Sequence, residues 1–203
     1  MGPGQPLRGF RDDILFGFQR MSLQLTTPPS LEPVTLAEAK LHLKVDTTDD
    51  DALIARLISA ARARAEWHTG RAWITQSWML WSDCWTERVE IPLPPLQSVT
   101  GVTVYAPDGT PTAIDTANYT VDAASQPARI AFSCIPPITL RTINAISIAF
   151  DAGYGATADD VPAPVREAIL EIVAELYVHR GDGPEEVSLA ALALLAPYRV
   201  FNL

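Results

Sequence analysis

The stretch DTTDDDALIARLISAARARAEWHTG, residues 46–70, decides the helical part of the fold. Thr48 is the expected N-cap of a helix, and the aspartates at 49–51 fill a first turn where the helix dipole favours anions. Gly70 is the expected end, because glycine readily adopts the left-handed conformation that stops a helix. The helix is about 19 residues long, roughly 28 Å. Its apolar residues recur at helical spacing and predict a core-facing stripe of Leu53, Ile54, Leu57, Ile58, Ala61 and Ala65.

Shorter helices are expected on both sides of this one. Thr35 and Glu38 have the spacing of a capping box, which predicts a helix that runs to about Val45. Near the C-terminus, a helix starts at the prolines 162 and 164 and is stopped by Gly181. Its predicted core stripe is Val165, Ile169, Ile172, Val173 and Leu176. A last helix is expected over residues 182–197, with Pro184 near its first position and Glu185 and Glu186 at its positive end.

Residues between the helical sections are rich in β-forming side chains. Strands are expected around 88–91 and 99–105, and Pro107-Asp108-Gly109 reads as a hairpin turn. Further strands are expected in ITQSWMLWSDCW (74–85), NYTVD (118–122), ARIAFS (128–133) and NAISIAFDAG (144–153). Five or six short strands with tight turns predict a small antiparallel sheet or barrel.

The predicted fold class is α+β, a helical bundle of N- and C-terminal helices with a small antiparallel β-sheet or barrel inserted between them. Its sections are an N-terminal extension (1–33), N-terminal helices (34–72), the β section (73–153), C-terminal helices (160–196) and a C-terminal tail (197–203). Residues 1–20 are interpreted as an extension from an upstream start or as an arm that orders on binding.

The charge limits the classes of partner. The formal net charge is −9, from 15 basic and 24 acidic residues. A general nucleic-acid binder needs a basic surface, so this class is disfavoured, but a conduit that DNA passes without sticking is compatible with an acidic surface. No apolar run approaches about 18 residues, so no membrane span and no membrane partner are expected.

Catalytic and metal motifs are missing from the sequence. It has no G-x-S-x-G, P-loop, G-x-G-x-x-G or H-E-x-x-H pattern. His42, His68 and His179 are expected near helix ends, and DTTDDD lacks the glycine and the last acid of a calcium loop. Cys84 and Cys134 form no CxxC pair, and whether they are free or bridged stays open. We therefore expect no enzyme, no cofactor and no metal.

Five tryptophans lie within 19 residues, at 67, 73, 78, 81 and 85. One interpretation is a stacking surface, for example for carbohydrate, which would make the protein a ligand-binding module. The other is packing at the junction of the long helix with the sheet, or at a subunit contact. The lack of interleaved basic residues from Trp73 to Trp85 favours packing.

The ending LAALALLAPYRVFNL, residues 189–203, is apolar where chain ends are usually polar. Two interpretations stay open. The apolar side chains of the tail fold back onto the protein's own helices, or the chain leaves the core at Pro197 and Tyr198–Leu203 binds another subunit.

Four ordered segments resemble the head–tail connector, or adaptor, proteins of tailed phages and of phage-derived gene transfer agents. They are PVTLAEAKLHLKVDTTDDDALIARLISAARARAEWHTGRAWITQSW (33–78), IPLPPLQSVTGVTVYAPDG (91–109), ISIAFDAGYGATADDVPAPVREAILEIVAELYVHRG (146–181) and LLAPYR (194–199). Each segment is weakly specific alone, but their order is more specific, including an AR…E…TGR helix end.

The resemblance implies a structural adaptor without catalysis. It implies a ring of this chain, twelve copies in the family, between the portal protein and the stopper or tail-terminator proteins, with DNA passing through the channel. The implied location is the neck of a phage-like particle assembled in the bacterial cytoplasm. The implied portal-binding residues are Pro197, Tyr198, Arg199, Val200, Phe201, Asn202 and Leu203.

Overall fold

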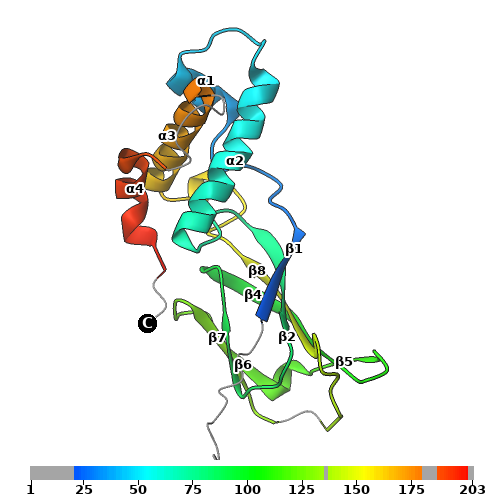
Figure 1. The fold of residues 1–203 in the computed structure, drawn as a ribbon. Coiled ribbons are helices and arrows are strands. Elements are labelled where there is room, and N and C mark those ends of the chain that lie inside the picture. The colour runs from blue at the N-terminus through cyan, green and yellow to red at the C-terminus, as the bar shows by residue number, and fades with distance from the viewer. Residues whose placement is uncertain (1–20, 135–136, 180–186, 201–203) are drawn as a thin grey trace, which may run out of the picture.

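Helices and strands form two sections of the molecule, one above the other in Figure 1. The computed structural model describes residues 21–134, 137–179 and 187–200. The helical section consists of α1 (Leu36–Leu43), α2 (Asp51–Thr69), α3 (Ala163–His179) and α4 (Leu189–Leu195). Short 3-10 turns lie at Thr116–Asn118, Ala158–Asp160 and Ala196–Tyr198. The predicted α+β class, with N- and C-terminal helices packed together around one core, is confirmed.

The start of α1 follows its predicted capping box. Thr35 Oγ1 accepts a hydrogen bond from the Glu38 amide at 3.2 Å, and Glu38 Oε2 accepts one from the Thr35 amide at 2.8 Å. The helix ends at Leu43, because Lys44 takes a left-handed conformation with φ 56°. The capping motif was therefore read correctly, and the end was placed two residues too late.

The start of α2 differs from the expectation. The N-cap is Asp50 and the helix begins at Asp51, so the prediction of Thr48 as N-cap was wrong. Residues 48–51 form a turn instead, in which the Asp51 amide donates to the Thr48 carbonyl at 3.2 Å. The Asp51 carboxylate pairs with Lys40 Nζ at 2.6 Å, which ties α2 to α1. The predicted end is confirmed, since Gly70 is left-handed with φ 69°.

The predicted core stripe of α3 is confirmed, whereas the last helix, predicted over residues 182–197, begins at Leu189 after the non-helical residues 187 and 188 and ends at Leu195. In α3, Val165, Ile169, Ile172 and Val173 are buried, and Leu176 packs against the same core. Ser188 caps α4, with Oγ accepting from the Ala191 amide at 3.2 Å. The expected helix stop and the expected proline and glutamates of the last helix lie outside the described residues: Gly181, Pro184, Glu185 and Glu186.

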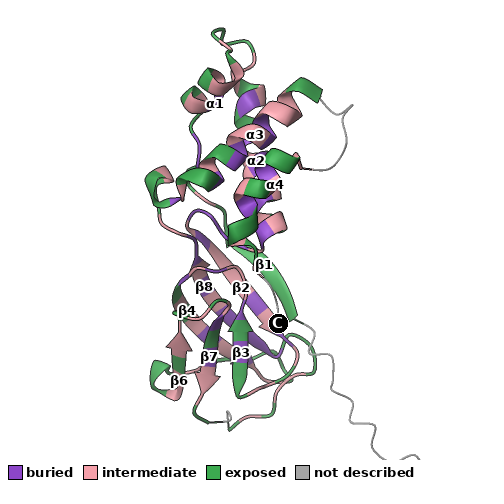
Figure 2. Ribbon diagram, turned by 90° about the vertical axis from the view of Figure 1, so that its left-hand side faces the viewer, coloured by how far each residue is buried: buried purple, intermediate pink, exposed green. Residues whose placement is uncertain are grey.

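The β section contains two antiparallel sheets that share one core. The larger has the order β1 (Met21–Thr27), β2 (Gln76–Ser82), β8 (Ile146–Ala152), β4 (Leu96–Tyr105), β5 (Pro111–Ala113). The smaller has the order β3 (Arg88–Ile91), β7 (Ala128–Phe132), β6 (Tyr119–Asp122). Figure 2 shows buried residues running through these strands and, separately, through the helices. The expected small antiparallel sheet or barrel is present as two antiparallel sheets with one shared core.

Strand β1 was not anticipated. Residues 1–33 were interpreted as an extension, but Met21–Thr27 pair with β2 along its length, for example Leu23 with Leu80. All seven residues of the strand are exposed, so burial gives it no sequence signal. Its place in the sheet comes from backbone pairing at an edge.

Three chain segments join the sections: 28–35 from β1 to α1, 70–76 from α2 to β2 and 152–162 from β8 to α3. The crossings 70–76 and 152–162 pass close together. They are hydrogen-bonded to each other: the Thr75 amide donates to the Gly155 carbonyl at 2.9 Å, and the Tyr154 amide to the Trp73 carbonyl at 3.2 Å. Gly153, in the crossing 152–162, has a φ of 133°. A Cβ at this position would come within 2.5 Å of the Ile74 carbonyl group in the other crossing. The crossings thus pass too closely for any side chain at this position.

Replacing this glycine tests the crossing. Gly153→Ala is expected to lower the free energy of unfolding by about 2–4 kcal/mol, through backbone strain and the clash with Ile74. Urea unfolding measures the change. Gly101→Ala is the matched control, because a Cβ there meets nothing within 4 Å. It should cost less than about 1 kcal/mol. Equal stability of the two variants would contradict the close approach.

Candidate functional site

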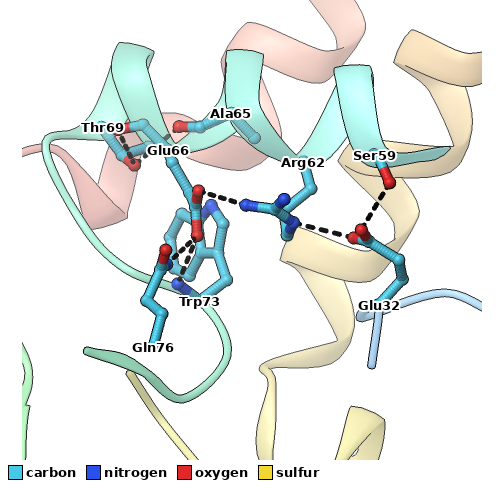
Figure 3. A network of polar contacts seen from close by, with 8 residues as sticks. All are labelled: Glu32, Ser59, Arg62, Ala65, Glu66, Thr69, Trp73 and Gln76. Carbon is cyan, nitrogen blue, oxygen red and sulfur yellow. Dashed lines mark hydrogen bonds and ion pairs between the residues drawn. The ribbon is translucent and has the colours of Figure 1, made fainter. Parts of the chain in front are cut away.

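A partly buried polar network holds the end of α2 against the first strand that follows it (Figure 3). Glu66 is its centre. Its Oε1 accepts hydrogen bonds from the Trp73 amide at 3.1 Å and from Gln76 Nε2 at 2.6 Å, and its Oε2 pairs with Arg62 Nη1 at 2.6 Å. One carboxylate therefore fixes both the helix end and the chain that turns away from it.

Arg62 extends the network to the N-terminal side of the fold. Its Nε donates to Glu32 Oε2 at 2.8 Å, and the other oxygen of Glu32 accepts from Ser59 Oγ at 2.6 Å. Glu32 belongs to the segment between β1 and α1. The network thus joins this segment, α2 and β2, which come from three parts of the sequence.

Burial raises the pKa of Glu66, and the nearby Arg62 guanidinium opposes this shift. A raised carboxyl pKa can mark a general acid, but such a group must reach a reacting atom. The Glu66 oxygens are instead taken up by Arg62, Trp73 and Gln76 within the protein. The arrangement therefore supports a structural role.

Arg71 receives the C-terminal segment directly after the helix end. Its Nε donates to the Tyr198 carbonyl, and its Nη2 donates to Gln126 Oε1 at 2.7 Å. The Val200 amide donates a hydrogen bond to the Thr69 carbonyl at 2.9 Å. This bond satisfies one of the backbone acceptors at the C-terminal end of α2. The segment 197–200 is therefore docked on the end of α2.

Aromatic rings continue this contact into the helical core. Tyr198 meets the edge of the buried Trp73 ring at a centroid distance of 5.8 Å, and Trp73 stacks on Tyr154 at 5.7 Å. Burial raises the pKa of Tyr154, in agreement with its place beside these rings. Aromatic pairs of this geometry contribute about 0.5–1.5 kcal/mol beyond the area that they bury.

These contacts revise the interpretation of the tail. The chain does not leave the core at Pro197, because Tyr198 packs on the core and Val200 bonds to α2. Of the seven predicted tail residues, Pro197, Tyr198, Arg199 and Val200 lie on the protein's own surface. The others, Phe201, Asn202 and Leu203, lie outside the described residues.

The five tryptophans do not form one stacking surface. Trp73 is buried in the helical core, whereas Trp78 and Trp85 pack against the core of the sheets. Trp81 packs against Tyr105 at 5.6 Å on the other face of its strand, and Trp67 is 86% exposed on α2. The packing interpretation therefore holds for most of the cluster.

Other chemistry-bearing residues are also dispersed. His42, His68 and His179 lie in the last turns of three different helices, as expected. Burial lowers the pKa of His68, and Arg199 of the tail adds to this effect. Cys84 and Cys134 are free and exposed. Within the described ranges, no group of three or more histidine, cysteine or acidic side chains is arranged to hold a metal ion.

The described part of the chain contains no helix that is both long and apolar enough to span a membrane.

A pH series on Glu66→Gln tests its burial. An acid whose pKa rises on folding contributes most to stability below its ordinary pKa of 4.5, and this contribution is lost as the pH rises through the raised value. The stability of the wild type relative to Glu66→Gln should therefore fall as the pH rises above 4.5 and through the raised pKa. Urea unfolding at several pH values measures this. Glu167→Gln, at an exposed glutamate of α3, is the matched control for a carboxylate on the surface. A pH-independent stability difference for Glu66→Gln would contradict the burial of Glu66.

The residues that build this site were only partly recognised from sequence. The AR…E…TGR pattern contains Arg62, Glu66, Thr69 and Arg71, but no role follows for them from the pattern itself. Two features of the sequence could have pointed to these residues. Glu66 lies on the apolar side of a long helix, and Arg71 directly follows the glycine that ends this helix.

Comparison with known proteins supports the resemblance. Residues 33–127 match the family described as Phage gp6-like head-tail connector protein. No curated protein sequence matches the chain.

Solved structures match over almost the full length. A chain from the neck of an empty gene transfer agent particle, computed with C6 symmetry, is 25% identical with a TM-score of 0.76, covering 90% of this chain and 97% of that chain. A chain from the virion of a native gene transfer agent particle is 22% identical with a TM-score of 0.71, covering 89% and 96%. A chain from the neck of a native particle, computed with C12 symmetry, is 24% identical with a TM-score of 0.71, covering 89% and 97%. The protein is thus similar in sequence to the phage gp6-like head-tail connectors over residues 33–127, and it has the fold of a chain from gene transfer agent necks.

Proposed function

We propose that the protein is a structural adaptor in the neck of a phage-like particle. The observation that carries this proposal is the likeness to a neck chain that covers 97% of that chain, together with the connector family match. The absence of a convergent acid, base or nucleophile among the described residues supports a role without catalysis. Assembly would take place in the bacterial cytoplasm.

The adaptor forms a ring between the portal protein and the stopper or tail-terminator proteins. The similar neck structures were computed with C6 and C12 symmetry, which supports several copies around one axis, and twelve is the proposed number. The formal charge of −9 suits a channel lining that DNA passes without binding.

The portal contact is assigned to residues 197–203. Tyr198 and Val200 hold the base of this segment on α2, which fixes where the remaining residues start. Phe201 and Leu203 supply apolar anchors, and Phe is enriched at interfaces. A short peptide binds weakly alone, but a ring multiplies the contact.

The carbohydrate-binding alternative receives no support from the geometry. Three of its tryptophans are divided between two cores, Trp81 is partly buried against Tyr105, and Trp67 is exposed by itself on α2.

Mixing the purified protein with its portal protein and imaging the product by electron microscopy tests the proposal. The expected result is a ring of this chain seated on the portal. A portal that remains bare at micromolar concentrations of the adaptor would sink the proposal.

Two truncations separate binding from folding. A chain ending at Val200 should keep the thermal stability of the wild type and lose portal binding in a pull-down. A chain ending at Ala196 also loses the Tyr198 contact with Trp73, and its free energy of unfolding should fall by about 2–4 kcal/mol. If the chain ending at Val200 still binds the portal normally, the last three residues have no portal role.

A further inference from the structure

An apolar groove runs along β1 and is covered by no other described residue. Its upper part has a volume of about 420 Å³ and lies between β1 and the end of α2, lined by Leu23, Leu25, Trp67, Trp78 and Leu93. Its lower part has a volume of about 320 Å³ and is lined by Met21, Leu23, Leu80, Pro92 and Pro127. Leu23 lines both parts, so they form one feature, the β1 groove.

The groove exists because the larger sheet is wider than the smaller one. Met21, Leu23 and Leu25 pair with Ser82, Leu80 and Trp78 of β2 and share their face, which is the face that packs on the sheet core. They remain 38–42% exposed. Beyond β2 the strand pairs with no other described strand, so its outer backbone edge is open as well.

We propose that the β1 groove binds the neighbouring copy of this chain in the ring. This inference rests on the proposed ring function. Exposed apolar residues beside an open strand edge promote aggregation of a free protein and are typical of association surfaces. The similar chains come from necks with C6 and C12 symmetry, where copies repeat around an axis.

Charge favours a second copy at this surface. Two chains of formal charge −9 repel each other unless they meet where charge is balanced. The charged residues that line the groove are two arginines and two glutamates, Arg62, Arg71, Glu66 and Glu90. The acidic excess of the chain therefore lies outside the groove.

Size favours assembly on a platform over a free dimer. A seven-residue strand is about 23 Å long at about 3.3 Å per residue. A strip of that length and about 10 Å wide offers on the order of 250 Å², well below the roughly 800 Å² per partner of a stable complex. Copies already held on a portal can use such a contact, because their effective concentration is high.

The neighbour presents a different face, since a repeated head-to-tail contact joins two unlike surfaces and closes into a ring. In Figure 1, α4 lies on the flank opposite β1. Its first residue, Leu189, is 85% exposed. This flank is the assigned counterpart of the groove.

Portal-bound rings of variants test the groove. Leu23→Glu places a charge in it, and Trp67→Ala removes an exposed wall on α2 without touching the sheet. Both should bind the portal as scattered copies, with at least a tenfold loss of complete rings by electron microscopy. Leu189→Glu should do the same. Leu41→Glu, at an 82% exposed leucine of α1 outside the groove, is the matched control and should form normal rings.

Three other results would overturn the inference. Complete rings from both groove variants would show that no neighbour uses the groove. Loss of portal binding by a folded groove variant would make the portal its occupant. Complete rings from Leu189→Glu would overturn the assignment of α4. A wild type that fails to bind the portal contradicts the proposed function itself, so the two failures are distinguishable.

Discussion

The Glu66 carboxylate is the constraint on which the arrangement of the two sections depends. It accepts hydrogen bonds from the Trp73 amide and from Gln76 and pairs with Arg62, so the direction in which the chain leaves α2 is fixed. Gln76 is the first residue of β2 and Trp73 is buried in the helical core, so these contacts link the sheet to that core. Buried ion pairs are costly to desolvate, and they are retained in some proteins because they specify one geometry. A joint between two separate cores needs such specification more than either core does.

The helices were predictable because their signals are local. The capping box at Thr35 and Glu38, the stripe in α2 and the glycine stop at Gly70 all depend on neighbours within a few residues. The start of α2 was misplaced because Thr48 and Asp50 are both residue types favoured at the N-cap, and local preference does not decide between them; the helix uses Asp50. Strand β1 was missed because its register comes from β2, whose paired residues lie 50 to 61 positions later in the chain, and none of its residues is buried.

The candidate site was less predictable than the fold because its parts meet only in three dimensions. The tail was recognised as unusual from composition, but its receptor is Arg71, 127 residues away from Tyr198. The sequence shows that Arg71 follows the glycine that ends α2, but it does not show that the Tyr198 carbonyl binds to Arg71. The tryptophan cluster was also hard to interpret from sequence. Successive residues of β2 face opposite sides of the sheet, so Trp78 packs on the core and Trp81 lies on the outer face.

The two exposed apolar surfaces, β1 and Trp67, are compatible with the proposed assembly of several copies in a ring. A subunit that must stay separate until it meets its platform cannot expose a large apolar interface, because it would associate too early. The described residues instead carry two small ones, the open edge strand β1 and the exposed Trp67 on α2. Each is too small to hold two free copies, and the excess of acidic residues adds repulsion. In the proposed ring, a template that fixes many copies at once makes these contacts sum.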